Sequence, residues 1–90
     1  MKSRTTEQFQ ELLAALPASI QRRAHDAYRL FQDDPFHPPL QFWRINPRDP
    51  TVYSARVGRR YRVIGIRNDD DVLWLWIGSH AEYDRIGDRF

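Results

Sequence analysis

The sequence predicts a single domain of the α+β class over residues 1–90. An N-terminal antiparallel helical hairpin is expected to pack on a three- to four-stranded antiparallel sheet, followed by a short C-terminal helix. Two observations predict this fold. Apolar residues in the first third of the chain recur at the helical spacing i, i+3, i+4 and i+7. Residues 52–83 instead contain alternating or continuous apolar runs rich in Val, Ile, Tyr and Trp, separated by short turn-forming segments.

Two amphipathic helices are predicted before residue 35. Thr5 and Gln8 have the spacing of a capping box, and the apolar residues that follow form one face: Phe9, Leu12, Leu13 and Leu16. Pro17 is well placed to open a second helix at its first turn. The apolar face of that helix consists of Ile20, Ala24, Ala27, Tyr28 and Phe31, and Asp34-Pro35 ends it. Because the connection is short, the two helices are expected to form an antiparallel hairpin.

A stiff loop and a polar turn are predicted between the helices and the central strands. Residues 35–39 contain three prolines. Residues 40–45 are expected to form a strand, and residues 46–50 a polar turn. At the other end of the chain, residues 81–90 are expected to form a short helix or tail.

Hydrophobic patterning determines the register of the first two central strands. If residues 58–60 form a three-residue loop, Arg56 lies opposite Arg62 and the apolar residues share the other face: Tyr53, Ala55, Val57, Tyr61 and Val63. A two-residue loop would scatter the arginines over both faces. Two arginines directly opposite each other repel. An anion bound over this face would relieve that repulsion.

The third central strand is continuously apolar from Val72 to Ile77. If an even-length loop precedes it, Ile77 pairs with Arg62 and Trp74 lies beside Gly65. His80 then falls just past the strand end, near the two arginines. The arginine face of the sheet should then also carry Leu75 and Ile77 and be only partly covered.

Charge is distributed unevenly along the chain. The net charge is +2, but residues 40–67 carry +6 and residues 68–90 carry −4. A positive middle segment is typical of polyanion binding. Thirteen of the 14 basic residues are Arg, whose planar guanidinium suits phosphate.

The composition also excludes several classes of protein. The chain has no Cys, which excludes disulfides and Cys-based zinc sites. No His, Asp or Glu cluster has the spacing of metal ligands, so no metal or cofactor is expected. No apolar run approaches the length of a membrane span. We therefore expect a soluble, intracellular protein.

Arg56, Arg62 and His80 are the candidate site residues that the predicted register brings together. The two arginines could hold a phosphate, and a His beside them could act as a general acid or base near neutral pH. The alternatives are solvated arginines on the outer side of a half-buried sheet, paired with Asp or Glu, and a His that serves as a helix-cap partner.

Other candidates lie nearby in the sequence. Tyr83 could donate a hydrogen bond or stack on a base, or it could anchor the tail to the sheet. Arg59 and Arg60 in the turn, and Arg44 in the preceding strand, are candidate contacts to an RNA backbone. The alternative for these residues is simple exposure to solvent.

This layout resembles the RelE/ParE superfamily of bacterial type II toxins. The resemblance covers nearly the whole chain: the helical hairpin, the Asp34-Pro35 loop, a strand, and the two segments at residues 52–57 and 61–64. The ending at residues 76–84, Trp-Ile-Gly-Ser-His-Ala-Glu-Tyr-Asp, is similar to a signature of the family. The superfamily includes ribosome-dependent mRNA endonucleases of the RelE and HigB type and gyrase poisons of the ParE type.

The resemblance also implies roles for particular residues. Arg62 matches the strand arginine that contacts the scissile phosphate in RelE-like enzymes, and Arg56 matches a basic residue on the preceding strand. Tyr83 is similar to their C-terminal tyrosine. His80 replaces a basic residue just after the last strand, and Ser54 stands where RelE itself has a lysine.

The function that the resemblance implies is that of a cytoplasmic toxin neutralised by a cognate antitoxin. It would act as a metal-independent, ribosome-associated mRNA endoribonuclease that inhibits translation, with Arg56, Arg62, His80 and Tyr83 as catalytic residues. The alternative is a non-enzymatic protein, either a ParE-like gyrase inhibitor or an inactive homologue that only binds the antitoxin. The antitoxin is expected to cover the arginine face, because the last strand has apolar residues on the side that the hairpin leaves open.

Overall fold

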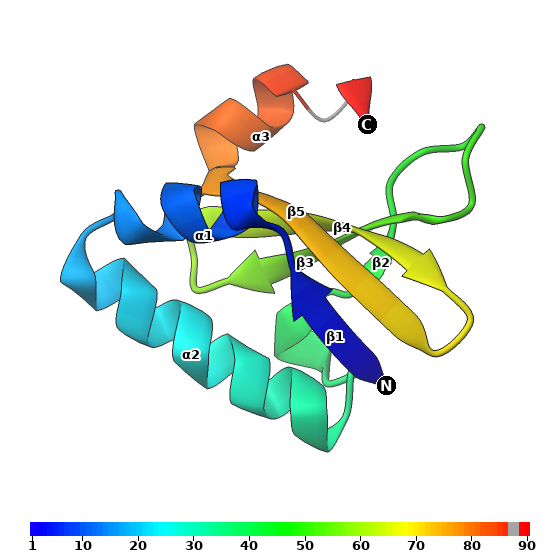
Figure 1. The fold of residues 1–90 in the computed structure, drawn as a ribbon, viewed down its shortest axis with the longest axis horizontal. Coiled ribbons are helices and arrows are strands. Elements are labelled where there is room, and N and C mark those ends of the chain that lie inside the picture. Colours follow the sequence, from blue (N-terminus) through cyan, green and yellow to red (C-terminus); the bar gives the residue numbers. More distant parts are fainter. Residues whose placement is uncertain (87–88) are drawn as a thin grey trace.

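The computed structural model describes residues 1–86 and 89–90 and consists of a five-stranded mixed sheet with helices on both faces (Figure 1). The elements in chain order are β1 (Lys2–Thr5), α1 (Glu7–Ala14), α2 (Ala18–Asp33), a 3-10 turn η1 (Pro38–Leu40), β2 (Trp43–Arg44), β3 (Val52–Val57), β4 (Tyr61–Asn68), β5 (Asp71–Ser79) and α3 (His80–Ile86). The strand order across the sheet is β1-β5-β4-β3-β2. The α+β class is therefore confirmed. The expected C-terminal helix forms up to Ile86, and its residues 87–88 lie outside the described residues.

The N-terminal strand β1 departs from the prediction. It pairs in parallel with β5, with Lys2 beside Asp71 and Thr5 beside Trp74. Three of its four residues are exposed, so the strand lacks the apolar alternation by which a strand is recognised in a sequence. The sheet is consequently mixed and five-stranded, rather than antiparallel with three or four strands.

The two N-terminal helices form close to where they were predicted. Thr6, not Thr5, is the N-cap of α1, and its hydroxyl accepts a hydrogen bond from the backbone N–H of Phe9 at 3.1 Å. Pro17 immediately precedes α2, and Asp34 caps its C-terminal end. α1 packs mainly on β5, whereas α2 packs mainly on β3 and η1. Because each helix buries its apolar face against the sheet, the two diverge from their connection (Figure 1) instead of forming a close hairpin.

The hydrophobic core has one cluster on each face of the sheet. The larger cluster lies under α1 and α2, where the ring of Phe31 meets those of Phe42 and Trp74 edge-on at centroid distances of 5.2 and 5.5 Å. The smaller cluster lies on the opposite face and consists of Val52, Ile64 and Trp76, with Tyr83 and Ile86 of α3 packed against it. α3 therefore covers part of the face that carries the arginines.

The register between β3 and β4 is the predicted one. Val57 pairs with Tyr61, and Arg56 pairs with Arg62. Residues 58–60 form the three-residue connection, which begins at Gly58 with a φ of 64°. This left-handed conformation is one that glycine adopts without steric cost. The loop length predicted from apolar alternation is therefore confirmed.

The predicted register between β4 and β5 is confirmed as far as Gly65, which pairs with Trp74, and is wrong beyond it because β5 contains a β-bulge. Gly65 pairs with Trp74 and Ile64 pairs with Trp76, so one residue of β5 has no partner in the ladder. Past the bulge, Arg62 pairs with Gly78 and not with Ile77. A shift of one residue exchanges the two faces of a strand.

The bulge also reassigns the apolar residues of β5 to the two faces. Ile77 pairs with Val63 and belongs to the core under the helices. The prediction that Ile77 lies on the arginine face is therefore wrong, and Trp76 takes that place. Leu75 is the residue that the ladder skips.

The segment before β3 contains less strand than predicted. β2 has only two residues, because Pro38–Leu40 form a 3-10 turn and Gln41 adopts a left-handed conformation with a φ of 46°. The polar turn after β2 is confirmed. There the side-chain oxygen of Asn46 accepts the backbone N–H groups of Arg48 and Asp49 at 2.8 and 3.2 Å.

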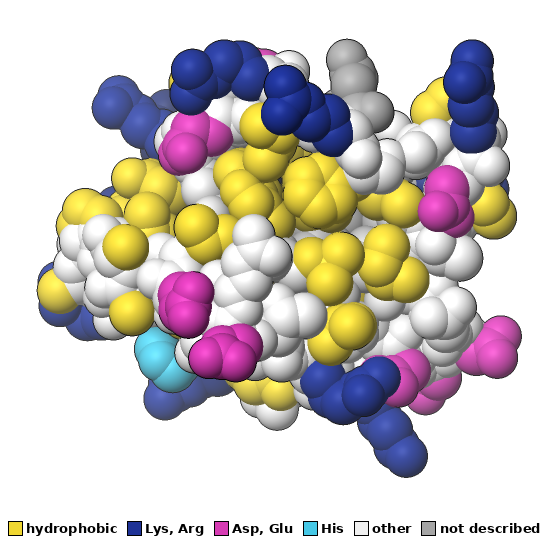
Figure 2. All heavy atoms as spheres, turned by 45° about the horizontal axis from the view of Figure 1, so that its top comes forward, with side chains coloured by type: hydrophobic (Ala, Val, Ile, Leu, Met, Phe, Trp, Pro, Cys, Tyr) yellow, Lys and Arg dark blue, Asp and Glu magenta, His cyan; other side chains and the backbone are white. Residues whose placement is uncertain are grey.

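The surface retains apolar area. Figure 2 shows hydrophobic side chains gathered in a band across one face of the molecule, with Lys and Arg side chains at its borders. The large hydrophobic side chains that are exposed are Tyr28, Leu30, Phe36 and Trp43. Within the part of the chain that the structure describes, no helix is both long and apolar enough to cross a membrane.

Candidate functional site

The arginines gather in a small polar pocket at the turn end of the β3–β4 hairpin. The pocket has a volume of ≈ 200 Å³, and its lining residues are Gln41, Arg56, Arg59, Tyr61, Arg62 and His80. They come from the end of η1, from β3, β4 and their connecting turn, and from the start of α3. We call this the arginine pocket. It brings Arg56 and Arg62, which pair across the hairpin, together with His80 from the start of α3.

Arg62 is the most constrained of the pocket residues. It is only 5% exposed. Its Nη2 and Nε atoms donate to the hydroxyl oxygen of Ser54 at 2.7 and 3.2 Å, and its Nη1 donates to the side-chain oxygen of Gln41 at 3.1 Å. Among the described residues all its hydrogen-bond acceptors are neutral, and no carboxylate forms a salt bridge with it. The guanidinium is therefore oriented without being neutralised.

Burial dominates the electrostatics of Arg62. Desolvation lowers the pKa of the guanidinium, interactions with Tyr83 oppose this effect, and the neighbouring charge of Arg56 adds to it. A buried cation with neutral partners is costly in the absence of a counter-ion. The pocket is thus an environment in which a bound anion would gain a strong, charge-assisted interaction.

Arg56 provides a second cation opposite Arg62. Its Nε donates to the carbonyl oxygen of Gly58 at 2.7 Å, which uses one of the five N–H donors of the guanidinium. The side chain of Arg23 from α2 lies against the same turn, because a Cβ atom on Gly58 would sit 3.1 Å from the Cδ atom of Arg23. Basic side chains from a helix and from the hairpin therefore meet at this end of the sheet.

A capping box at the start of α3 holds His80 at the pocket. The backbone N–H of Glu82 donates to the hydroxyl of Ser79 at 3.1 Å, and the carboxylate of Glu82 accepts the backbone N–H of Ser79 at 3.1 Å. The backbone N–H of His80 donates to the carbonyl oxygen of Arg60 at 2.6 Å. The imidazole is half-exposed, and its Nε2 lies 3.6 Å from the carboxylate of Asp84.

Tyr83 connects α3 to Arg62. It lies one turn after His80, and the two ring centroids are 5.9 Å apart. The Cζ atom of Arg62 lies 5.2 Å from the centroid of the Tyr83 ring, which is within the range of a cation–π interaction. The ring also packs on the smaller core cluster. Anchoring the C-terminal helix and contacting the pocket are therefore compatible roles for this residue.

The three other basic candidates occupy different positions. Arg59 lines the arginine pocket. Arg60 is exposed, and its backbone carbonyl is what contacts α3. Arg44 pairs with Tyr53 across β2 and β3, and directly opposed residues of paired strands point to the same face. Because Tyr53 packs against the core under the helices, Arg44 lies on the helix face, away from the arginine pocket.

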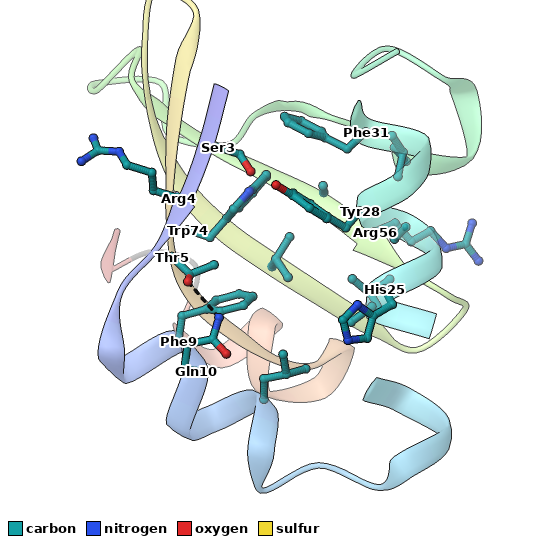
Figure 3. Close-up of a pocket in the computed structure, with 17 residues that line it drawn as sticks. Ser3, Arg4, Thr5, Phe9, Gln10, His25, Tyr28, Phe31, Arg56 and Trp74 are labelled. Carbon is teal, nitrogen blue, oxygen red and sulfur yellow. Dashed lines mark hydrogen bonds between the residues drawn. The ribbon is translucent and has the colours of Figure 1, made fainter. Parts of the chain in front are cut away.

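A larger cavity of ≈ 310 Å³ lies between the two N-terminal helices and the sheet (Figure 3). Phe9, Tyr28 and Trp74 line it, while the side chain of Arg4 points away from it (Figure 3). Its lining is mainly apolar and has no cluster of groups suited to acid–base chemistry. Among residues 1–86 and 89–90, no group of three or more His, Cys, Asp or Glu side chains could hold a metal ion. The arginine pocket is therefore the candidate site.

A sequence model of the ParE-like toxin domain matches residues 18–85, which include every residue of the arginine pocket. The chain belongs to the ParE-like toxin family. The resemblance to the RelE/ParE superfamily that the sequence suggested is thereby confirmed. No curated protein sequence matches the chain significantly.

Three solved structures with the same fold are chains of toxin–antitoxin complexes. A chain of the RelB–RelE antitoxin–toxin complex of Methanococcus jannaschii is 20% identical, with a TM-score of 0.70 over 90% of this chain and 95% of that one. A chain of the RelBE2 toxin–antitoxin complex of Mycobacterium tuberculosis is 21% identical, with a TM-score of 0.69 over 88% and 96%. A chain of the RelE–RelB complex of Pyrococcus horikoshii is 22% identical, with a TM-score of 0.68 over 87% and 92%. These structural similarities show that the chain has the same fold as those three proteins.

Two residues at the site of this ParE-like toxin did not emerge from the sequence. Gln41 directs both its side-chain oxygen and its backbone carbonyl to Arg62, at 3.1 and 3.4 Å. Its left-handed backbone has no sequence signal, because glutamine shows no preference for it. Trp43 lies with its ring 5.9 Å from the Cζ of Arg62. Its alternation with the buried Phe42 was a signal that could have placed it on the arginine face.

Proposed function

We propose that this ParE-like toxin is a RelE-type endoribonuclease that cleaves mRNA on the ribosome and thereby inhibits translation. The observation that carries the proposal is the Arg62 guanidinium, which is buried, held by neutral acceptors and open to a pocket with two further arginines. Such a group favours a phosphate that enters the pocket. The +6 charge of residues 40–67 supports the same proposal.

The proposed chemistry uses the nucleophile of the substrate. The 2′-oxygen of the RNA attacks the adjacent phosphorus, the bond from phosphorus to the 5′-oxygen of the next nucleotide breaks, and a 2′,3′-cyclic phosphate remains. Arg56 and Arg62 stabilise the charge that builds on the phosphoryl oxygens. The 2′-hydroxyl loses its proton as the new bond forms, and the leaving 5′-oxygen takes one up. His80 carries out one of these two transfers and solvent water the other, with Asp84 near one of the ring nitrogens of His80. Tyr83 orients the base or the leaving oxygen. The step requires neither a covalent enzyme nucleophile nor a metal.

Substitution of Arg62 tests the proposal. We expect Arg62→Ala to abolish growth inhibition and to lower the rate of mRNA cleavage on purified ribosomes by about 10²-fold or more, since one preorganised charge donor contributes on this scale. Arg62→Lys keeps the charge but loses the planar contacts to Ser54 and Gln41, so it should recover only part of the activity. Cleavage should be mapped on the mRNA itself to identify the products.

The controls separate chemistry from folding. Arg44→Ala removes an exposed arginine on the other face and should leave cleavage unchanged. Circular dichroism and thermal unfolding of each variant establish that it is folded. A folded Arg62→Ala variant that cleaves ribosomal mRNA as fast as the unchanged protein would contradict the proposal.

A non-enzymatic gyrase inhibitor is the competing function, and the match to the ParE-like domain model favours it. The two functions have different first effects in the cell. Incorporation of labelled amino acid and of labelled thymidine should be measured separately after induction. An early arrest of translation supports the ribonuclease, whereas an early arrest of DNA replication that persists in the Arg62→Ala variant supports the gyrase inhibitor.

We further propose that a cognate antitoxin neutralises this toxin by covering the arginine pocket. An acidic segment would complement the basic middle of the chain. Hydrogen exchange of the toxin with and without the antitoxin tests this. Protection of β3, β4 and the start of α3 supports occlusion. Protection confined to the outer surface of α2 around Gln21 and Arg22 would show that inhibition works without covering the pocket.

A further inference from the structure

Trp43 is an exposed tryptophan beside the arginine pocket. It is 52% exposed, whereas Trp74 and Trp76 are 6% and 9% exposed. Neither hydrophobic cluster of the described residues includes it. Core packing therefore does not explain a tryptophan at this position. A single exposed hydrophobic side chain is ordinary on a protein surface, but the Trp43 ring also lies close to Arg62.

The strand itself fixes the direction of Trp43. Phe42 is buried in the core under the helices, with its ring centroid 5.2 Å from that of Phe31 and 4.8 Å from that of Tyr53. Successive residues of an extended chain point to opposite faces, so Trp43 points to the other side. Its pairing with Ser54 agrees, because Ser54 lies on the arginine face. A buried anchor therefore holds the indole at the pocket.

Two aromatic rings lie within about 6 Å of the Arg62 guanidinium. The Trp43 ring centroid lies 5.9 Å from the Cζ of Arg62, and that of Tyr83 lies 5.2 Å from it. One ring comes from the edge strand β2 and the other from α3. A phosphate held by Arg62 would therefore carry its attached nucleosides toward aromatic surfaces. Bases of unpaired nucleic acid stack on such rings, whatever their sequence, because every base has a π-face.

We propose that Trp43 is the base-stacking residue of the arginine pocket. It holds a nucleobase adjacent to the phosphate that Arg62 binds, and this makes the site select unpaired RNA nucleotides over paired ones. The inference rests on the proposed RNA substrate, but it concerns binding and does not depend on cleavage. Trp43 is thus a positioning residue for the substrate, and Arg62 remains the phosphate contact.

Tryptophan fluorescence measures the proposed contact directly, because Trp43 is the exposed indole of the three. The probe is a short single-stranded 2′-O-methyl oligoribonucleotide, which lacks the free 2′-hydroxyl and cannot be cleaved by the proposed route. We expect it to quench the fluorescence of the full chain. A hairpin with the same nucleotides fully paired should quench much less.

Substitutions assign the signal to Trp43. Trp43→Phe should abolish the quenching yet bind the oligonucleotide, as measured by fluorescence anisotropy of a labelled strand, because phenylalanine still stacks. Trp43→Ala should weaken binding by about 5- to 150-fold. The matched control is Phe36→Ala, which removes an exposed aromatic ring near Phe42 and away from the pocket, and it should leave binding unchanged.

The outcomes separate this inference from the proposed function. Quenching that Trp43→Phe abolishes, together with ribosomes that yield no cleaved mRNA, supports base stacking and overturns the ribonuclease. Two results together would overturn base stacking and leave the proposed ribonuclease intact. The oligonucleotide would fail to quench the fluorescence of the unchanged protein, and Trp43→Ala would cleave mRNA on ribosomes with unchanged kcat and KM. Equal quenching by paired and unpaired strands would overturn the selection of unpaired RNA.

Discussion

Ser54 and Gln41 orient Arg62 with oxygen atoms that carry no formal charge. Ser54 is completely buried, and its hydroxyl accepts two N–H groups of the guanidinium. A carboxylate in the same position would make the same hydrogen bonds but would cancel the charge. The choice of a hydroxyl and an amide therefore leaves a fixed arginine with its positive potential directed into the pocket.

This arrangement predicts that Ser54 stabilises the fold through Arg62. Ser54→Ala leaves guanidinium N–H groups buried without an acceptor, so we expect a loss of about 1–3 kcal/mol in the free energy of unfolding. Urea denaturation followed by circular dichroism measures it. In an Arg62→Met background the same substitution should cost clearly less, because the groups that need Ser54 are gone. Equal costs in both backgrounds would contradict the account.

At the scale of single residues, the sequence predicted pairings better than conformations. The opposition of Arg56 and Arg62 followed from apolar alternation alone, since only one loop length keeps the arginines on one face. The role of Gln41 could not be predicted. Its left-handed backbone is imposed by the 3-10 turn before it and by the burial of Phe42 after it, and both depend on tertiary contacts.

At the scale of elements, α3 depends on the reciprocal bonds between Ser79 and Glu82. We expect Ser79→Ala to destabilise this helix by about 0.5–2 kcal/mol, a typical cost of losing an N-cap. The amides of α3 should then exchange faster with solvent, while those of β3 and β4 should not change. Arg85→Gln, an exposed substitution outside the capping box, is the control. Unchanged exchange in Ser79→Ala would show that packing of Tyr83 and Ile86 alone holds the helix.

The loop before β3 contains Asp49, whose protonation should change the free energy of unfolding. Hydrogen bonds from the hydroxyl and the backbone N–H of Thr51 lower the pKa of Asp49 from its ordinary value of 3.8. A carboxyl whose pKa falls on folding stabilises the folded state above its ordinary pKa and loses that contribution as the pH falls through its folded pKa.

We therefore expect Asp49→Asn to be less stable than the unchanged protein at pH 7, with the difference shrinking once the pH falls below 3.8. Urea unfolding at a series of pH values measures the difference. Thr51→Val removes the hydroxyl donor, so NMR titration should find the pKa of Asp49 closer to its ordinary value in that variant. A stability difference that is independent of pH would argue against this role of the carboxylate.

The bulge in β5 shows why elements are easier to predict than their register. The sequence predicted a strand at residues 72–77 correctly. It did not predict the skipped residue, because Val72 to Ile77 are all apolar and every register looks equally acceptable. Packing in the folded protein determines the register. A Cβ atom on Gly65 would lie 2.7 Å from the Trp74 ring, so this glycine provides the space in which Trp74 lies across β4.

At the scale of the whole molecule, the parallel strand β1 forms one edge of the sheet and covers β5. The backbone N–H groups of Lys2 and Thr6 donate to the carbonyl oxygens of Asp70 and Trp74. Because N–H groups alternate in direction along a strand, that of Arg4 also faces β5, and that of Ser3 faces outward. Arg4 additionally forms an exposed salt bridge with Asp71 at 3.2 Å.

Two proline substitutions test whether β1 belongs to the cooperative fold. Arg4→Pro removes a donor within the ladder and should lower the unfolding temperature, whereas Ser3→Pro removes an outward N–H and should lower it less. Arg4→Ala measures the contribution of the salt bridge, which we expect to be at most about 1 kcal/mol because it is exposed. Equal unfolding temperatures for the two proline variants would indicate that β1 is not part of the cooperative unit.

The fold class could be predicted because it depends on long, strongly patterned segments, namely the apolar faces of α1 and α2 and the alternation in β3 and β4. The family was suggested by a resemblance that also includes the ending at residues 76–84. β1 could not be predicted, since its residues are polar and exposed and its stability comes from pairing with β5. The divergence of the two helices also depends on β1, because a five-stranded sheet offers each helix its own apolar surface.

The pairing of β1 with β5 also has a consequence for the nascent chain. Arg4 and Asp71 are 67 positions apart, so β1 leaves the ribosomal exit tunnel long before its partner exists. Contacts across such a separation form late, because closing the long loop costs entropy that the finished sheet must offset. His80 and Tyr83 emerge after β5. We therefore expect the arginine pocket to assemble only after residue 83 has left the tunnel, so that its charged residues remain separate during most of the synthesis.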